Sequence, residues 1–392
     1  MLSLDWATCY NTGKSLCLLE GTMERSFLLP NGDRLACTER AAIFTFSGPR
    51  AVLSTAANGG GLRYDLTSAF NHCDCGRAGI CQPMEGRTLR DHQIAAARRL
   101  GLDSDHTTGL NTAANLDNMV IITKEWGDLW ATAAVSGGAD VNALCAGDPA
   151  FLTEDNGEPC AVPRGTINIF LITDCALTPG AMAELMLTAT EAKTAVLHDL
   201  MQGSSVSSAL ATGTGTDGMV IICGTEEDKR LLNAGKHFKF GELAAQAVRE
   251  AVKEALFRQT GLCPQSQHSV LQRLRRFGIT ESSLAARCLA GNTAWSAAFS
   301  RRLARLDRDA FLVAAVSLYV HLMDQGRTGM LTGQEAGDWA NHLLSEIGQH
   351  YACPLPIMGD MPLPERLERY LSDLLAASLQ EQERLYPEEP PI

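Results

Sequence analysis

The sequence predicts an α/β protein, with a mixed sheet flanked by helices, followed by an all-α C-terminal extension. Strand-like segments fill the first part of the chain, strands then alternate with helices, and no strand pattern returns after Pro264. The chain has 392 residues, of which 45% are hydrophobic and 20% charged, so two domains are expected. We place them at residues 1–262 and 263–392, the second being a helical region of unknown role.

Turn signals and β-branched runs predict the strands. Asn31-Gly32 marks a hairpin between two short strands, and residues 41–46 form another strand. Residues 166–173 and 218–223 are apolar runs of the kind found in strands buried on both faces. Further strands are expected in three segments, 52–58, 119–123 and 131–136, the first running into three consecutive glycines.

Helical spacing and glycine stops predict helices over residues 90–100, 179–198 and 241–257. The apolar stretch Phe311 to Met323 is too short for a bilayer span, which needs ~20 residues, so it indicates a buried helix. The last residues, PEEPPI, have a composition typical of disorder.

Charge and cysteine usage narrow the function. The 33 basic and 45 acidic residues give a net charge of −12, and no basic stripe interrupts this balance, so nucleic acid is excluded as an expected partner. The 13 cysteines are scattered, and no secretory segment opens the chain, which favours free thiols and a reducing compartment. We therefore expect a cytoplasmic protein that does not associate with a membrane.

The segment Ala211-Thr-Gly-Thr-Gly-Thr-Asp217 is the first candidate for chemistry. Its glycines free the backbone, its threonines supply hydroxyl groups, and Asp217 at the strand entry can act as base or ligand. It matches neither a Walker loop nor a dinucleotide-binding fingerprint, and a tight Gly-rich turn is an equally good interpretation. Asn168, within a buried strand, either ties that strand to a loop or contacts a ligand through its amide.

Thr190-Glu191-Ala192-Lys193 lies within a predicted helix. Residues two apart on a helix point to different sides, so Glu191 and Lys193 cannot both face one small site. A solvated helix face is the simplest interpretation of these two charges.

Other reactive side chains have simpler interpretations. His72, Cys73, Asp74 and Cys75, with Cys81 and His92 downstream, lack the paired spacing of a structural zinc site, so no metal is assigned. Cys145 is either a nucleophile or a small buried side chain. His237 and Lys239 either supply a proton or bind an anion, or they belong to a solvated turn.

A self-processing amidase with an N-terminal Thr nucleophile is a further alternative. Gly165-Thr166 and Gly213-Thr214 would be its cleavage points. One uninterrupted chain argues against cleavage, although an unprocessed precursor would look the same.

Several motifs follow one another in a specific order. They are Leu53-Ser-Thr-Ala-Ala-Asn-Gly-Gly60, Phe70-Asn-His72, Gly109-Leu-Asn-Thr-Ala-Ala114, Gly137-Gly-Ala-Asp-Val-Asn-Ala143, Gly165-Thr-Ile-Asn-Ile169, Thr188-Ala-Thr-Glu-Ala-Lys193, Ala211–Asp217 and Lys239-Phe-Gly-Glu-Leu243. In this order the chain resembles the adenosylcobinamide amidohydrolase family, CbiZ, from about Leu53 to Leu256. The cysteine-rich insert around Cys73–Cys81 departs from the simplest members, and the resemblance does not extend beyond Gly261.

The resemblance implies cleavage of the amide that joins the corrin ring to the aminopropanol arm of adenosylcobinamide. The product, adenosylcobyric acid, returns to coenzyme B12 assembly by salvage. Our own hypotheses for the roles are that Asp217 or Glu191 activates water and that Lys193 or His237 protonates the leaving amine. The Gly-Thr-Gly-Thr amides and hydroxyls would stabilise the oxyanion. The alternative is a non-catalytic corrinoid-binding or sensing protein on the same fold.

The large corrin substrate also needs polar groups around its rim. The residues expected to bind substrate are Ser54, Asn58, Gly59, Gly60, Asn71, His72, Asn168, Thr212, Gly213, Thr214, Gly215 and Thr216. No cofactor is expected. The corrinoid is the expected small-molecule partner, and a homo-oligomer is possible.

Overall fold

The structure is a computed structural model that describes residues 18–19, 22–23, 25–75, 83–150, 165–289, 296–356 and 361–385. The chain divides into two compact units. The first comprises Met1–Ser205 with Leu210–Cys263, and the second Val206–Ala209 with Pro264–Ile392. The expected tail segment PEEPPI and Cys81 lie outside the described residues.

A seven-stranded mixed sheet forms the centre of the first unit. Its strands run in the order β10-β11-β13-β15-β6-β7. The short strand β16 pairs with the C-terminal end of β13, at Ala176 and Leu177. The pairing is antiparallel except between β13 and both β15 and β16. The strands are β6 (Ala51–Ser54), β7 (Gly61–Arg63), β10 (Val120–Trp126), β11 (Leu129–Gly138), β13 (Thr166–Leu177), β15 (Gly218–Gly224) and β16 (Arg230–Leu231).

A second sheet of five strands has the order β3-β4-β5-β8-β9, and only β8 and β9 run parallel. Two short pairs, β1 with β2 and β12 with β14, lie outside both sheets. These strands are β1 (Leu18–Leu19), β2 (Thr22–Met23), β3 (Arg25–Leu28), β4 (Arg34–Cys37), β5 (Ala41–Thr45), β8 (Ser68–Cys73), β9 (Thr107–Thr112), β12 (Ala143–Leu144) and β14 (Gly213–Thr214).

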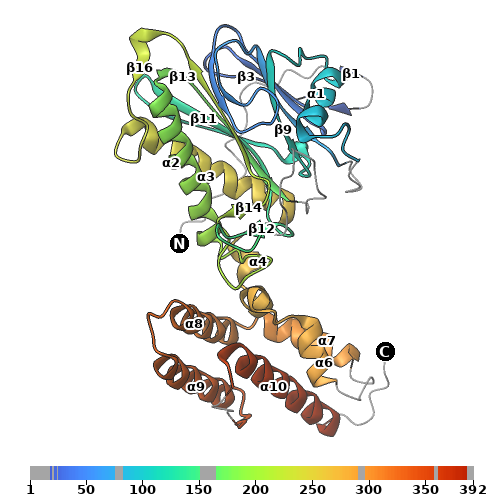
Figure 1. Cartoon of the computed structure of the whole chain (residues 1–392). Helices are drawn as coiled ribbons and strands as arrows, with labels where there is room; N and C mark the ends of the chain where they lie inside the picture. The colour runs from blue at the N-terminus through green and yellow to red at the C-terminus, as the bar shows by residue number, and fades with distance from the viewer. Residues whose placement is uncertain are drawn as a thin grey trace, which may run out of the picture. The chain divides into compact units, whose positions relative to one another are not determined.

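The first unit has four layers, which are α1 (Leu89–Arg99), the five-stranded sheet, the seven-stranded sheet, and α2 (Pro179–Asp199) with α3 (Lys239–Thr260) (Figure 1). Alternation along β13 sends Ile167, Ile169 and Leu171 toward the helices α2 and α3. The intervening Phe170 faces the second sheet, where its ring stacks on that of Phe44 at 4.5 Å. The long apolar strand is thus buried on both faces, as its composition predicts.

Helix α1 covers the outer face of the second sheet, where Ala96 and Ala97 pack on Phe70. Helix α2 begins after the N-cap Thr178 with Pro179 in its first turn, and α3 ends at Gly261, which has a left-handed φ of 71°. Short 3-10 turns lie at Leu116–Asn118, Glu227–Lys229 and Arg275–Phe277.

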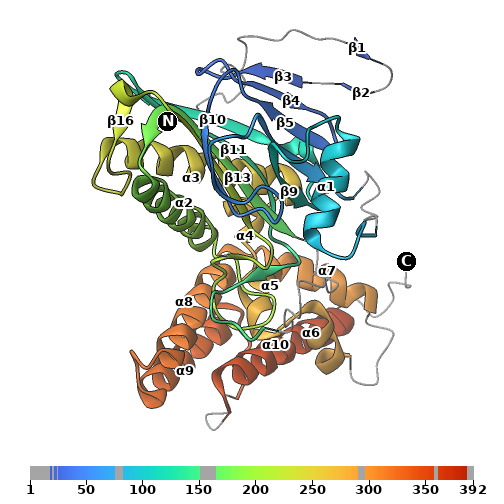
Figure 2. The ribbon, with the colours of Figure 1, turned by 45° about the horizontal axis from the view of Figure 1, so that its top comes forward.

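The regular secondary structure described in the second unit is all helical (Figure 2), and the unit has its own core. Tyr319, at its centre, is fully buried, and its hydroxyl donates to the Leu363 carbonyl at 3.0 Å. Its helices are α4 (Pro264–Gln267), α5 (Val270–Leu274), α6 (Glu281–Cys288), α7 (Ser296–Asp307), α8 (Ala310–Arg327), α9 (Gly333–His350) and α10 (Leu363–Leu385).

The main expectations for the fold class are confirmed. The hairpin at Asn31-Gly32, the two apolar strands β13 and β15, and the helical extension are present. The second sheet was not indicated by the sequence pattern. The predicted buried helix corresponds to α8, although its Leu318 is 57% exposed.

Within the described residues, no helix combines the length and apolar character that a bilayer crossing requires. One cysteine corrects the expectation of free thiols, because Cys75 is disulfide-bonded. Cys73, Cys145, Cys175, Cys223 and Cys288 are free.

Candidate functional site

The Gly-Thr segment lies between α2 and β15, as a loop that includes the short strand β14. This strand pairs with β12, so that Thr214 faces Ala143 and Gly213 faces Leu144 in the register. The segment is therefore held against a neighbouring loop, at the end of the large sheet where β13 and β15 begin.

A cation and a carboxylate meet at this position. The ammonium of Lys193, on the inner side of α2, donates to Oδ2 of Asp217. The Lys193 side chain is 9% exposed and that of Asp217 17%, so water screens this pair little. The contact between the two opposite charges compensates for the hydration that burial removes from each group.

Gly213 makes room for the pair. A Cβ atom at this position would lie 2.3 Å from Asp217 Oδ2 and 2.7 Å from Lys193 Nζ. Any side chain would therefore displace the carboxylate or the ammonium. The motif needs glycine here because of this close approach, and not only because of backbone flexibility.

The other donors of the segment are already engaged within the protein. The Thr214 amide donates to Asp217 Oδ2 at 3.0 Å, and the Gly215 amide to the Asn142 carbonyl at 3.3 Å. The Thr212 hydroxyl accepts from the Ala146 amide at 2.8 Å, while the Thr216 hydroxyl donates to the Gly165 carbonyl at 2.9 Å. Three of the expected oxyanion donors, the Thr214 and Gly215 amides and the Thr216 hydroxyl, therefore donate within the chain.

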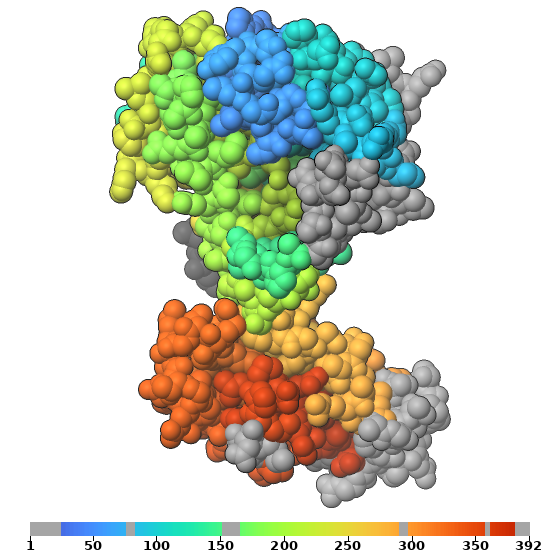
Figure 3. Space-filling model, in the orientation of Figure 1, coloured from blue at the N-terminus to red at the C-terminus, as the bar shows by residue number. Residues whose placement is uncertain are grey.

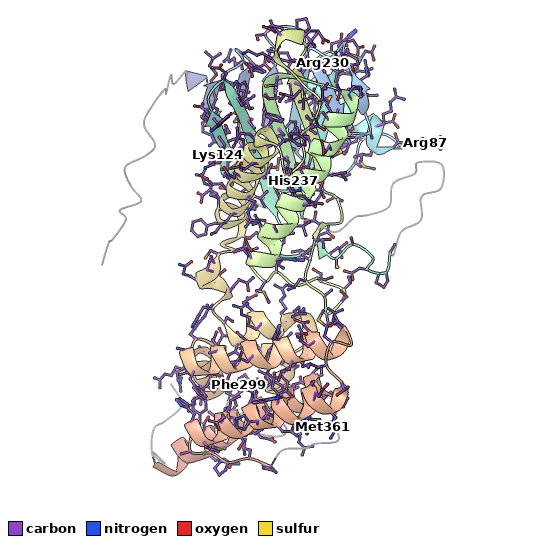
Figure 4. All side chains as sticks on the ribbon, turned by 90° about the vertical axis from the view of Figure 1, so that its left-hand side faces the viewer. Arg87, Lys124, Arg230, His237, Phe299 and Met361 are labelled. Carbon is purple, nitrogen blue, oxygen red and sulfur yellow. The ribbon has the colours of Figure 1, made fainter. Side chains whose placement is uncertain are left out.

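The structure separates the other two predicted catalytic residues from the Lys193–Asp217 pair. Glu191 is on the exposed side of α2, where its carboxylate accepts from Lys236. His237 is an exposed residue of the loop before α3, on the side of the unit that carries α2 and α3 (Figure 4). The separation of Glu191 from Lys193 that helix geometry predicts is thus found in the fold.

A second polar group lies between the two sheets. Asn168, on β13, donates through Nδ2 to Asn71 Oδ1 and to the Asn111 carbonyl, both at 2.9 Å. Asn71 in turn donates to the Ser136 hydroxyl at 2.8 Å. Both donor hydrogens of Asn168 are thereby used, which fixes its amide orientation. Its buried Oδ1 has no hydrogen-bond partner among the described residues.

A third group lies on the outer face of the second sheet, beside α1. Oδ1 of Asp74 is 2.8 Å from His72 Nδ1 and 3.0 Å from His92 Nε2, and it accepts from Asn111 at 3.0 Å. Burial tends to raise the pKa of Asp74, but the hydrogen bonds from His72 and His92 outweigh it and lower the pKa to about 2. The carboxylate is therefore charged.

His72, Asp74 and His92 belong to the set of His, Cys and Asp residues that superficially suggests a metal site in the sequence. In the described part of the chain, no group of three or more His, Cys, Asp or Glu residues has an arrangement that can hold a metal ion. His72 and His92 instead both donate to one carboxylate oxygen, Oδ1 of Asp74.

The four predicted substrate-binding residues from the end of β6 to Gly60 make contacts within the protein. The Ser54 hydroxyl accepts from Thr108 at 2.8 Å, and the Asn58 side chain donates to the Ser104 carbonyl at 2.9 Å. A Cβ at Gly59 would lie 2.3 Å from the Thr107 carbonyl oxygen, and one at Gly60 1.9 Å from that of Ala56. The glycines thus allow backbone to approach backbone. In Figure 3 the segment that contains these glycines is part of the blue surface, which lies beside the cyan surface of the chain around α1.

One short stretch of β13 joins the first two groups. The Ile167 amide donates to Asp217 Oδ1 at 2.9 Å, and the next residue is Asn168. Sequence reasoning did not assign roles to Asn111, Ser136 or Asn142, which support these groups. The signal was present, because Asn111 and Asn142 lie within the ordered motifs.

The fold and the site define a layered α/β protein with a shielded cation, a carboxylate and a hydroxyl in contact, a set of groups suited to acyl transfer. The chain belongs to the adenosylcobinamide amidohydrolase family, CbiZ, whose model matches residues 28–264. It is also similar to an uncharacterized protein of Methanocaldococcus jannaschii, with 35% identity over 181 residues that cover 43% of this chain and 70% of that protein.

Proposed function

We propose that this protein hydrolyses the amide bond between the corrin ring and the aminopropanol arm of adenosylcobinamide. The products are adenosylcobyric acid, which serves coenzyme B12 salvage, and the free amino alcohol. The observation that carries the proposal is the family match over residues 28–264, which contains the whole Lys193–Asp217 site. We assign the reaction to residues 1–262 and no role to the helical region.

Amide hydrolysis requires a nucleophile, a proton acceptor and stabilisation of the negative charge on the carbonyl oxygen. Lys193 supplies a positive charge in surroundings of low water content, where electrostatic interactions are strong. Its ammonium has three N–H groups, and the one contact among the described residues is with Asp217. The remaining N–H groups are suited to the carbonyl oxygen of the scissile amide.

Asn168 suits recognition of an amide substrate. Its Oδ1 is a buried acceptor without a donor among the described residues, and it lies one residue from the Ile167 amide that holds Asp217. An N–H of a corrin side-chain amide would supply the missing hydrogen bond, which makes binding of an amide-rich rim favourable. Asn71 supports Asn168 directly, and His72 contacts Asp74 on the other face of the second sheet, whereas Ser54, Asn58, Gly59 and Gly60 act through the fold.

The reaction is tested directly with the purified full-length chain. It is incubated with adenosylcobinamide, the corrinoids are separated by chromatography, and both products are identified by mass. We expect adenosylcobyric acid and amino alcohol in equal amounts. Asp217→Asn is expected to lose this activity, and Glu191→Gln, altered only in an exposed ion pair, to retain it.

The same experiment separates the alternative of a corrinoid-binding protein without catalysis. Adenosylcobinamide that stays bound to the wild-type chain and is recovered unchanged would contradict the proposed reaction and favour a binder or sensor. A panel of simple linear amides, assayed for released amine, would detect a different amidase.

A further inference from the structure

The contacts of Asp217 limit what this carboxylate can do. Its two oxygens accept from Lys193 Nζ, from the Ile167 and Thr214 amides and from the Thr214 hydroxyl. A carboxylate offers about four lone-pair sites, so these donors fill it. No site is left for an attacking water molecule. The sequence-based hypothesis that Asp217 activates water is therefore difficult to reconcile with this geometry.

One of the four donors can itself become a nucleophile. Thr214 Oγ1 donates to Asp217 Oδ1 at 2.5 Å, the distance of a strong hydrogen bond between a hydroxyl and a charged carboxylate. A nucleophile and its base are recognised by hydrogen-bond contact, with the base oriented by a third group. Here Lys193 and the Ile167 amide orient Asp217.

The neighbouring hydroxyls of the motif are engaged differently. Thr212 Oγ1 accepts from the Ala146 amide, and Thr216 Oγ1 contacts the Gly165 carbonyl and the Thr166 hydroxyl, the latter at 2.6 Å. Neither contacts a carboxylate in the described structure. Thr214 is also partly exposed.

We propose that Thr214 is the catalytic nucleophile and that the reaction passes through an ester on its side chain. This inference rests on the proposed function and adds the identity of the attacking atom. In this proposal the nucleophile is the side chain of an internal residue, whose backbone amide also donates to Asp217, and not a new N-terminus.

Asp217 carries the transferred proton through both halves of the reaction. The Thr214 hydroxyl gives its proton to Asp217 while Oγ1 forms a bond to the amide carbonyl carbon, and Lys193 faces the resulting oxyanion. The C–N bond then breaks, and the amine leaves with the proton from Asp217, so that the corrin carboxyl is esterified to Oγ1. Esterified Oγ1 no longer donates to Asp217, so the site that the Thr214 hydroxyl occupied on Oδ1 is free for water. Water then attacks the ester, giving a proton to Asp217 and hydroxyl to the carbon. Cleavage of the ester C–O bond returns the proton to Oγ1.

The test measures cleavage of adenosylcobinamide in the presence of hydroxylamine. Hydroxylamine captures an acyl-enzyme as a hydroxamate, so we expect this product to replace the acid while total amide cleavage stays constant. Intact-protein mass spectrometry of the acid-quenched wild-type reaction detects the corrinoid acyl adduct. The same measurement on protein without substrate shows whether the chain is uncut. Acid formed without any hydroxamate would overturn the proposal.

Variants of Thr214 test whether the corrinoid acyl group is attached to this residue. Thr214→Ala is expected to lose at least about 10³-fold in turnover and any adduct, whereas Thr214→Ser keeps both. Thr190→Ala, which removes an exposed hydroxyl of α2, is the control and should match wild type. Thermal unfolding of each variant shows whether it is folded, and the Ser variant remains informative if Ala does not fold.

The outcomes separate the two proposals. Wild-type rates from folded Thr214→Ala would overturn the nucleophile and leave the amidohydrolase function intact. Absence of product from the wild-type chain, with substrate shown to be intact, would overturn both.

Discussion

The ammonium of Lys193 contacts Asp217 Oδ2 in a space that exists only because residue 213 has no side chain. Helix α2, the Gly-Thr segment and the start of β15 converge here. The glycine lets a residue of α2 reach the residue that precedes β15, within the connection between the two elements. The space left at residue 213 can therefore be tested separately from the two charges as a requirement for amide cleavage.

Gly213→Ala should disrupt the site although it changes no polar group. The new Cβ would lie 2.3 Å from Asp217 Oδ2, so the carboxylate or the lysine must move. We expect a loss of about 1–3 kcal/mol in the free energy of unfolding, together with loss of amide cleavage. Gly180→Ala is the matched control on α2, because nothing lies within 4 Å of its Cβ position. Equal activity of the two variants would contradict the interpretation.

Removing one partner of the buried pair should cost more than removing one partner of an exposed pair. Lys193→Met leaves Asp217 without its cation, and we expect destabilisation of about 3–5 kcal/mol in urea unfolding. Lys236→Met leaves Glu191, which is 56% exposed, and should change stability by less than about 1 kcal/mol. Similar losses for both variants would show that the Lys193 pair is screened by water after all.

The hydrogen bonds between the sheets should be coupled. Asn168→Ala leaves Asn71 Oδ1 without its donor, at an expected cost of about 1–3 kcal/mol. Asn71→Ala removes the same bond from the other side. In the double variant the two costs should therefore fall short of additivity by roughly 0.5–3 kcal/mol, measured by denaturant unfolding. Strict additivity would mean that the two amides do not interact.

Asp74 should give the first unit a stability that disappears in acid. Its pKa is lowered from 3.8 to about 2 in the fold, so the folded state favours the charged carboxylate. The contribution is present above the unfolded pKa and is lost as the pH falls through the folded one. The difference corresponds to roughly 2 kcal/mol above pH 4.

The measurement compares Asp74→Asn with the wild type in unfolding curves between pH 7 and pH 2. The variant should be less stable at neutral pH, and the two proteins should converge toward pH 2. Asp103, an exposed carboxylate paired with His106, is a suitable second position, where substitution by Asn should have a smaller effect. A constant difference across the whole range would exclude the carboxylate charge as its cause.

Local sequence patterns predicted most elements because their causes are local. Thr178 and Pro179 set the start of α2, Gly261 ends α3, and Asn31-Gly32 closes the first hairpin. The division of the strands between two sheets could not be predicted in this way. It depends on pairings such as β5 with β8 and β6 with β15, which join residues far apart in the chain.

The candidate site was predicted in part for the same reason. Helical periodicity alone places Glu191 and Lys193 on different sides of α2, and this separation is found in the fold. The partners of Lys193 could not be read from the sequence, since they depend on how α2 packs beside β15. The glycines appeared to free the backbone for a ligand, whereas Gly213 makes room for two side chains.

The adjacency of Ile167 and Asn168 on β13 has a consequence for how this protein can vary. The backbone of the first residue holds Asp217, and the side chain of the second joins the two sheets. A deletion of one residue between Gly165 and Asn168 would turn every later side chain of the strand to the opposite face. Both polar groups would be lost in a single event, so this strand tolerates substitutions far better than changes in length.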